Sequence, residues 1–297
     1  MKKVHFIINP IAGKGGTGLD TLTLSKYFKP EDYEIEIKTS DYPGHASILT
    51  MESVANGADI VVACGGDGTI NEVASCLVHT PVTLGIIPLG SGNGFAESLH
   101  ISRNVQRAIE VIKDGKEGHV DVAMVNGKPF FSNMGIGFDA KVISNYNASK
   151  ERRLWAYLKA ILKSIKDFKY NESLQVEMNG KKFQTNPFMF FISNSKVMGY
   201  DISLTRTASL EDGLLDVVII ENLSRGEMLV LGLLVLLRLS QYLKKVKYYK
   251  VKELKVAFTS VHNDRLIQAD GELHNLGGQD VVVNIQEQGL CVLMPQG

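Results

Sequence analysis

The chain has 297 residues, of which 44% are hydrophobic and 22% charged, so it can form two ordinary domains with sizeable cores. Its 32 basic and 32 acidic residues give zero formal net charge, which argues against a nucleic-acid-binding protein. Its three cysteines form no CxxC pair and favour reduced thiols in a cytoplasmic protein over a disulfide framework.

The first 120 residues alternate between strand and helix patterns. Strands are predicted at 3–8, 33–38, 59–64 and 83–87, and helices at 17–28, 44–55, 70–78 and 104–113. This alternation predicts a parallel sheet covered by helices.

From about residue 120 onward, strand patterns dominate. They fall at 119–125, 128–134, 173–178, 182–184, 187–193, 214–220, 252–259, 265–269 and 280–285, with two helical segments at 149–168 and 224–242. Asn-Gly pairs at 126–127 and 179–180 are hairpin signals. We therefore predict an α/β domain over 1–122, a mostly antiparallel β sandwich or barrel over 123–289, and a return of 290–297 to the first domain.

The loop Gly-Gly-Asp-Gly-Thr-Ile-Asn-Glu at 65–72 follows the predicted buried strand 59–64 and precedes a helix. In an open α/β sheet, ligands bind at this end of the strands. Glycines let backbone N–H groups approach an anion, and the helix N-terminus adds a favourable dipole. Asp67 would repel a phosphate unless a cation lay between them, so the loop predicts a nucleotide with Mg²⁺.

The loop at 9–18 contains a formal GxGxxG pattern between Gly13 and Gly18, and Asp41 follows at the distance of a ribose-binding acid. A dinucleotide-binding domain is therefore one alternative, and a tight turn without a ligand is another. A Walker A loop is excluded, because Lys14 is followed by glycine rather than Ser or Thr.

A third glycine-rich loop, Pro-Leu-Gly-Ser-Gly-Asn-Gly-Phe-Ala at 88–96, also ends a strand and begins a helix. One such loop has an ordinary structural explanation. Three loops at the same edge of one sheet would converge on one crevice, which favours a binding site.

The NPxxG-type first loop, GGDGTINEV and PLGSGNGFA, in this order and spacing, resemble the diacylglycerol kinase catalytic-domain family. This family includes bacterial lipid kinases and the sphingosine and ceramide kinases. Segments 133–139, 210–216 and 270–272 resemble its N-x-G-x-G-x-D, D-G-x-L and D-G-E segments, so the resemblance covers nearly the whole chain. It implies an N-terminal α/β domain with a parallel sheet, like NAD kinases and phosphofructokinases, and a C-terminal β-sandwich.

The resemblance also implies site residues. Those expected to bind ATP are Asn9, Pro10, Gly13, Thr39, Gly65, Gly66, Asp67, Gly68, Thr69, Asn71, Glu72, Ser91 and Asn93. Asp67 would organise the phosphates and Mg²⁺, and Glu272, with Asp270 close by, would be the general base on the lipid hydroxyl. A second, structural Mg²⁺ would be held by Asp212 and by the backbone carbonyls of Ser209 and Leu214.

The chemistry agrees with these roles, because phosphoryl transfer needs positioning, charge neutralisation and an oriented nucleophile. A hydroxyl is a poor nucleophile at neutral pH, so a nearby carboxylate such as those of Asp270-Gly271-Glu272 helps. The alternative for this segment is an ordinary surface β-turn.

The third loop departs from a common pattern of the family. Many bacterial relatives carry G-T-x-N-D-F-A-R, whereas here Gly94 replaces the Asp and Glu97 replaces the Arg. Ser91-Gly92-Asn93 is nearer to the sphingosine kinase version. A metal-water role of the missing Asp is therefore not carried over to this chain.

The longest apolar run, at 228–237, is about ten residues, whereas a membrane-spanning helix needs roughly 20. The segment 228–247 ends with Arg238, Lys244, Lys245 and Lys247, so its helix either lies on an anionic membrane or packs on the β domain. The basic segment 150–153, before Leu-Trp-Ala-Tyr at 154–157, has the same two interpretations.

We thus predict a cytoplasmic, ATP- and Mg²⁺-dependent lipid kinase, peripheral at the membrane during catalysis. It would transfer the γ-phosphate to a hydroxyl of diacylglycerol or a related lipid, with ATP between the two domains. The alternatives are an NAD kinase-like enzyme and a non-catalytic nucleotide or lipid sensor with the same fold. A homodimer is left open.

Overall fold

The computed structural model describes residues 1–13, 18–149, 154–168, 173–197, 204–205, 207–236, 239, 243–259 and 265–296. Residues 14–17 of the first glycine loop and the basic segment 150–153 lie outside this described part, as does Arg238. The chain divides into two units, one formed by 1–122 and 287–297 and the other by 123–286.

The first unit is built on a parallel sheet. Its strands are β1 (Lys2–Ile8), β2 (Tyr33–Thr39), β3 (Ile60–Gly65) and β4 (Thr83–Pro88), and its helices are α1 (Thr21–Leu24), α2 (His45–Ala55), α3 (Asp67–Leu77), α4 (Gly94–Ser98) and α5 (Val105–Asp114). The strands run in the order β2-β1-β3-β4, all parallel. Every residue of β3 and β4 is buried, as expected for a sheet covered on both faces.

Two long strands contribute to both units. These are β5 (Lys116–Val125) and β16 (Val281–Met294). Near its end β16 runs parallel to β4, with Val292 opposite Leu84, and so extends the sheet of the first unit.

The register of the parallel sheet brings the loops that follow its strands to one edge. Ile8 lies opposite both Thr39 and Cys64, and Gly65 lies opposite Pro88. All four strands therefore end at the same level. The glycine-rich loops leave from this edge, which is the position that the sequence predicts for a ligand site.

The second unit is a two-sheet sandwich. Its strands are β6 (Lys128–Phe130), β7 (Asn133–Gly137), β8 (Leu174–Met178), β9 (Lys181–Thr185), β10 (Met189–Ser193), β11 (Leu215–Ile220), β12 (Val246–Val251), β13 (Glu253–Phe258), β14 (Leu266–Ala269) and β15 (Glu272–Asn275), and its helices are α6 (Phe138–Asn147), α7 (Leu154–Asp167) and α8 (Arg225–Leu236). One sheet has the order β12-β11-β10-β7-β14-β15 and is antiparallel throughout. The other contains β16, β13, β8 and β9 in adjacent, antiparallel positions.

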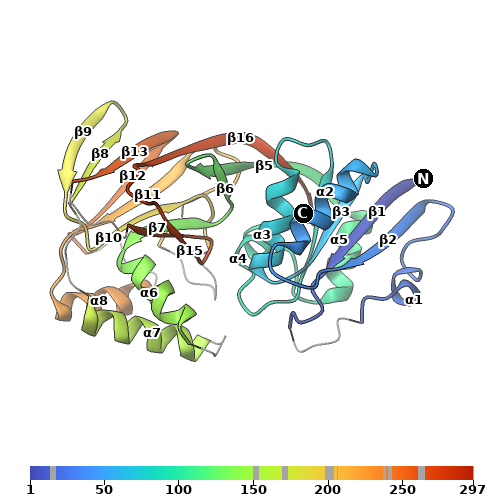
Figure 1. Cartoon of the computed structure of the whole chain (residues 1–297), viewed down its shortest axis with the longest axis horizontal. Helices are drawn as coiled ribbons and strands as arrows, with labels where there is room; N and C mark the ends of the chain where they lie inside the picture. Colours follow the sequence, from blue (N-terminus) through green and yellow to red (C-terminus); the bar gives the residue numbers. More distant parts are fainter. Residues whose placement is uncertain are drawn as a thin grey trace. The chain divides into compact units, whose positions relative to one another are not determined.

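Alternate residues of β10 serve two different cores. Phe190 and Ile192 join the core between the two sheets, together with residues of β8 and β13. Met189 and Phe191 join a second core, together with Met228 of α8. Figure 1 shows α6, α7 and α8 gathered along one side of this unit's strands. The helices therefore cover the outer face of the β10 sheet, and the predicted α/β plus β-sandwich fold is confirmed.

Several predicted elements differ from the observed ones. The predicted strand 128–134 is two strands, and α6 was missed, because Gly137 at φ +87° turns the chain from β7 into a helix. β12 and β15 were also missed. β15 follows Asp270 and Gly271 directly, and both residues have positive φ, so a tight turn separates β14 from β15.

Candidate active site

Asp67 fastens the third glycine loop to the second. One carboxylate oxygen, Oδ2, accepts a hydrogen bond from the Asn93 N–H at 2.7 Å, and Oδ1 accepts one from the Gly94 N–H, also at 2.7 Å. Each oxygen keeps a second lone pair, so Asp67 can still accept a hydrogen bond from a metal-bound water. The carboxylate therefore holds the third loop against the second, and it remains compatible with the predicted Mg²⁺ role.

Glycine is required where these two loops meet. A Cβ on Gly65 would lie 2.5 Å from the Thr69 side chain, and one on Gly90 would lie 2.7 Å from the Gly66 Cα. The Leu89 N–H also donates to the Gly65 carbonyl at 2.8 Å. The sequence predicted glycines for close approach to an anion, and the structure adds that the second and third loops approach each other closely at Gly66 and Gly90.

The first loop joins the same group. Asn9 Nδ2 donates to Thr69 Oγ1 at 3.1 Å, and Asn9 Oδ1 accepts from the Ile11 N–H at 3.2 Å. Gly13 has φ +71°, and a Cβ there would lie 2.9 Å from the Leu89 carbonyl oxygen. Three loops from three strand ends thus contact one another, while Pro10 beside them is exposed.

The N-terminus of α3 lies within this group of loops. Gly66 is its N-cap residue and, among the described residues, no side chain caps it. The first N–H groups of a helix have no partner inside the helix and carry the positive end of its dipole. Gly68, in the first turn, is exposed and has open space where a Cβ would be. The arrangement suits a phosphate group.

Some predicted nucleotide-binding residues hold the loops together in the structure. Asn93 is 1% exposed, and its amide group both accepts from and donates to the main chain of Gly90, at 3.1 and 2.6 Å. Glu72 Oε1 accepts from the Gly44 N–H at 2.9 Å, which ties α3 to the loop after β2. Asn71 accepts from the Ser75 hydroxyl at 3.2 Å.

Two other predicted residues present their side chains at this edge. Thr39 is the last residue of β2 and is exposed, and Ser91 in the third loop is exposed as well. A cavity of about 160 Å³ adjoins the third loop, and its lining includes Pro88, Glu97 and Arg103. This cavity therefore lies at the edge of the sheet from which the glycine-rich loops leave.

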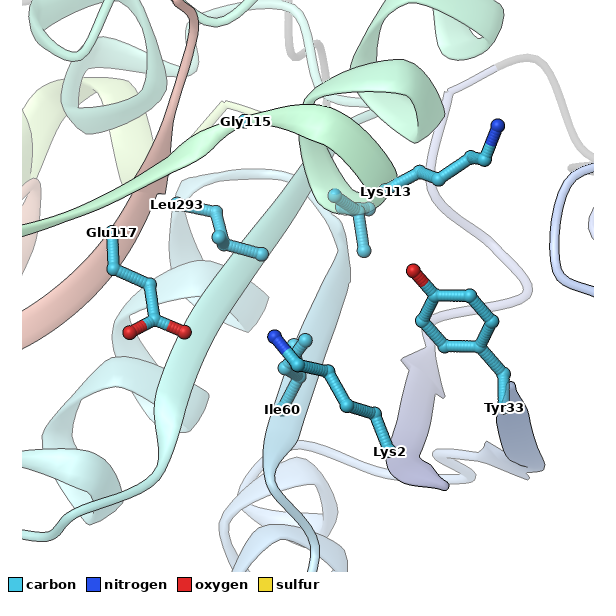
Figure 2. Close-up of a pocket in the computed structure, with 8 residues that line it drawn as sticks. Lys2, Tyr33, Ile60, Lys113, Gly115, Glu117 and Leu293 are labelled. Carbon is cyan, nitrogen blue, oxygen red and sulfur yellow. The ribbon is translucent and has the colours of Figure 1, made fainter.

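A larger cavity of about 320 Å³ lies elsewhere in the first unit (Figure 2). Lys2, Tyr33 and Ile60 line it, and they are the first residues of β1, β2 and β3. It is therefore at the opposite edge of the sheet from the glycine loops, and its greater volume does not make it the catalytic pocket.

In the second unit, Asp270 and Glu272 have different surroundings. Asp270 forms the β14–β15 turn at φ +48°, and its carboxylate accepts three backbone hydrogen bonds, from Phe131 at 2.7 Å, Ser132 at 2.8 Å and Asn133 at 3.1 Å. Glu272 is exposed at the start of β15. Of the two, Glu272 has the exposed carboxylate.

A buried amide that the sequence analysis missed supports this turn. Gln268 is 2% exposed, and its Oε1 accepts from the Gly271 N–H at 2.9 Å. Its Nε2 donates to Asn133 Oδ1 at 2.9 Å and to Asp139 Oδ2 at 2.6 Å. The D-G-E turn is thereby linked to the 133–139 segment. Asn133 and Asp139 carried a motif signal, whereas Gln268 carried none.

Burial raises the pKa of Asp139 to about 6, and the hydrogen bond from Gln268 opposes this effect only in part. The buried carboxylate also occupies the space above Gly135, where a Cβ would lie 2.1 Å from Asp139 Oδ2. Asp139 is thus enclosed in the unit and supports the turn from inside.

In the predicted second metal set, the carboxylate of Asp212 is paired with a lysine. Asp212 Oδ2 lies 2.7 Å from the Lys250 ammonium, and its Oδ1 accepts from the Leu214 N–H at 3.1 Å. Ser209 uses its hydroxyl to accept from the Glu211 N–H at 3.2 Å. In the described ranges there is no group of three or more His, Cys, Asp or Glu side chains able to hold a metal. The Lys250 ammonium thus lies against the one side-chain ligand of the predicted set.

Two family models match the chain. The model described as "Diacylglycerol kinase catalytic domain" matches residues 3–125, and "YegS C-terminal NAD kinase beta sandwich-like domain" matches residues 132–294. The chain belongs to the diacylglycerol kinase catalytic-domain family. The three loops at 9–13, 65–72 and 88–96 therefore lie in the part that the first family model covers, and the D-G-E turn lies in the part that the second covers.

Individual relatives agree with this family. The chain is 28% identical over 279 residues to a diacylglycerol kinase of Staphylococcus aureus (strain MRSA252), covering 91% of this chain and 86% of the relative. The fold is similar to that of a diacylglycerol kinase from Bacillus anthracis str. Sterne, with a TM-score of 0.71 and 19% identity over 99% of this chain and 97% of that chain. No helix within the described ranges has both the length and the apolar character of a bilayer-spanning segment.

Proposed function

We propose that the protein is an ATP-dependent lipid kinase that transfers the γ-phosphate to a hydroxyl of diacylglycerol or a related lipid. The observation that carries the proposal is the meeting of three glycine-rich loops around the uncapped N-terminus of α3. Such a cluster of backbone N–H groups binds phosphates. Family membership supports the choice of a kinase, and the names of the relatives support a lipid acceptor.

Each loop then has a defined task. The N–H groups at the start of α3 would bind the phosphates, and Asp67 would keep the second and third loops together around them. Thr39 and Ser91, exposed at the same edge, would contact the rest of the nucleotide. Mg²⁺ would neutralise phosphate charge, with Asp67 accepting from its bound water.

Glu272 would take the proton from the lipid hydroxyl as that hydroxyl attacks the γ-phosphorus, and the bond to the β-phosphate oxygen breaks. Its exposure permits contact with a substrate. Asp270, whose carboxylate already accepts three backbone hydrogen bonds, would position the turn rather than react.

Contact with a membrane would bring the lipid within reach. On α7, Trp155 is 72% and Leu162 61% exposed, and Lys159, Lys163 and Lys166 are exposed at spacings that share a helix face. An aromatic and apolar face with several lysines suits an anionic bilayer surface. On α8, three apolar side chains are also exposed, Leu229, Val230 and Leu233.

One experiment tests the function. The purified chain is incubated with γ-labelled ATP, Mg²⁺ and mixed micelles that contain diacylglycerol, phosphatidylglycerol, sphingosine, ceramide or undecaprenol, with NAD as a parallel acceptor. We expect label in the diacylglycerol or a related lipid. Label in NAD alone would favour an NAD kinase-like enzyme instead.

A sensor without catalysis is the remaining alternative. It would bind nucleotide and transfer no label to any acceptor. If Asp67→Asn and Glu272→Gln leave every ATP-dependent activity unchanged, the catalytic assignment is wrong.

A further inference from the structure

Lys250 contacts the segment in which the family resemblance implies a structural Mg²⁺. It lies on β12 directly opposite Asp216 of β11 in the antiparallel register. Its ammonium is 2.7 Å from Asp212 Oδ2, 3.1 Å from Asp216 Oδ2 and 3.2 Å from the Thr207 carbonyl oxygen. Two carboxylates and one backbone carbonyl thus surround one lysine cation.

Two of these contacts are hydrogen bonds, to Asp212 Oδ2 and to the Thr207 carbonyl oxygen, and the third is an ion pair with Asp216. Asp216 is 5% exposed and needs a compensating charge. Its Oδ1 accepts from the Thr207 hydroxyl at 3.0 Å. Within the described residues Oδ2 makes no hydrogen bond of normal geometry, so its compensation is the ion pair with Lys250.

The same oxygens are those that Mg²⁺ would prefer, namely carboxylate and carbonyl ligands at about 2.0–2.1 Å. A divalent ion bound to Asp212 Oδ2 would lie beside the Lys250 ammonium, which already contacts that oxygen, and the two positive charges would repel. A metal would have to displace an ammonium that the cross-strand register holds in position.

We propose that Lys250 is the built-in cation of the 207–216 loop, so that this loop needs no divalent metal ion. The proposal concerns the structure of the second unit and is independent of the kinase assignment.

The test uses Lys250→Met, which keeps most of the side-chain stem and removes the charge. Tm is measured by calorimetry on the full chain without nucleotide, in EDTA and in millimolar Mg²⁺ or Ca²⁺. We expect the same Tm for the wild type under both conditions. In EDTA the variant should melt roughly 2–5 °C lower, and the divalent ion should restore part of this loss.

Two further variants make the result specific. Lys247→Met removes an exposed ammonium from the same strand, where it pairs with Glu221, and should show no divalent response. Lys250→Met combined with Asp212→Asn should lose the divalent response of the single variant.

Either of two results would overturn the proposal. In one, EDTA lowers the Tm of the wild type and Asp212→Asn abolishes that effect, which means that the loop holds a metal. In the other, Lys250→Met melts like the wild type and gains no divalent response, which means that the ammonium is not the cation of the loop.

Discussion

At the scale of single residues, the two carboxylates of the D-G-E turn have become distinguishable. The family resemblance implies that Glu272 is the general base with Asp270 close by, but their spacing of two residues gives no physical reason for the difference. The structure commits Asp270 to the N–H groups of residues 131–133 and leaves Glu272 exposed. The carboxylates therefore respond to substitution in different ways.

Glu272→Gln should lower kcat by about 10²–10⁴-fold, because a general base is lost. Its Tm and its KM for ATP should stay near the wild-type values, because the side chain is exposed.

Asp270→Asn should lower the unfolding free energy by about 2 kcal/mol, because an amide N–H then faces backbone N–H groups. Kinase assays and calorimetry on both variants check this, and equal Tm losses in the two would contradict it.

Asp139 predicts a dependence of stability on pH. Its folded pKa of about 6 exceeds the unfolded value of 3.8, so the stability it contributes is present below pH 3.8 and is lost as the pH rises through 6. The Asp139→Asn variant has no carboxyl group at this position and so lacks this pH dependence. The unfolding free energy of the variant minus that of the wild type should therefore rise by about 3 kcal/mol between pH 4 and 7. Urea unfolding across this range measures it, and a constant difference would refute the assignment.

At the scale of elements, β10 and β11 consist mostly of apolar residues, because both faces of these strands are buried. Helices cover one face of their sheet, and the second sheet covers the other. The same helices leave apolar side chains exposed. On α8, Met228 and Leu231 are buried whereas Leu229 and Leu233 are exposed.

Flotation with liposomes tests the proposed membrane contact of these helices. The wild type should float with phosphatidylglycerol-containing vesicles and bind neutral vesicles more weakly, because the lysines of α7 favour anionic lipid. Leu229→Ser with Leu233→Ser should weaken binding at least about tenfold. Met51→Ser removes an apolar residue of α2 in the first unit that is 56% exposed, and it serves as the control. Wild-type protein that floats with neither lipid would exclude this contact.

The elements also show which parts of the fold and of the site could be predicted from the sequence. The continuous apolar runs predicted β1, β3 and β4 well, because parallel strands that are buried on both faces are apolar along most of their length. The site was predicted as a set of loops at one sheet edge. The hydrogen bonds that hold the site together, such as those from Asn93 to Gly90 and from Gln268 to Asp139, were not predicted, because they depend on the folded geometry of the loops.

At the scale of the whole molecule, the first unit is assembled from both ends of the chain. Leu290, Val292 and Leu293 are 1%, 0% and 5% exposed, and Val292 pairs with Leu84 of β4. The Gln288 N–H donates to Asp121 Oδ1 at 2.8 Å. The first 122 residues thus form their core together with residues 287–297.

Truncation after Gln286 should therefore destabilise the first unit. Three buried aliphatic side chains stabilise by roughly 1.5–3 kcal/mol each, so their sum is comparable with the stability of a domain. Hydrogen exchange should show loss of protection in β4, while the strands of the 123–286 unit stay protected. A chain ending at Met294 keeps all of β16 and is the matched control. Equal protection of β4 in both chains would show that the C-terminal strand is dispensable.

The attachment of Asp67 to the third loop has a consequence for sequence variation. Its partners are main-chain N–H groups, at residues 93 and 94, rather than side chains. Any residue except proline offers such a group, so the anchor by itself does not specify the side chain at the buried position 94. Gly94 and Glu97, the two departures from the pattern that the resemblance implies, therefore leave both donors of the anchor in place. Selection can then alter the chemistry of this loop independently of its position.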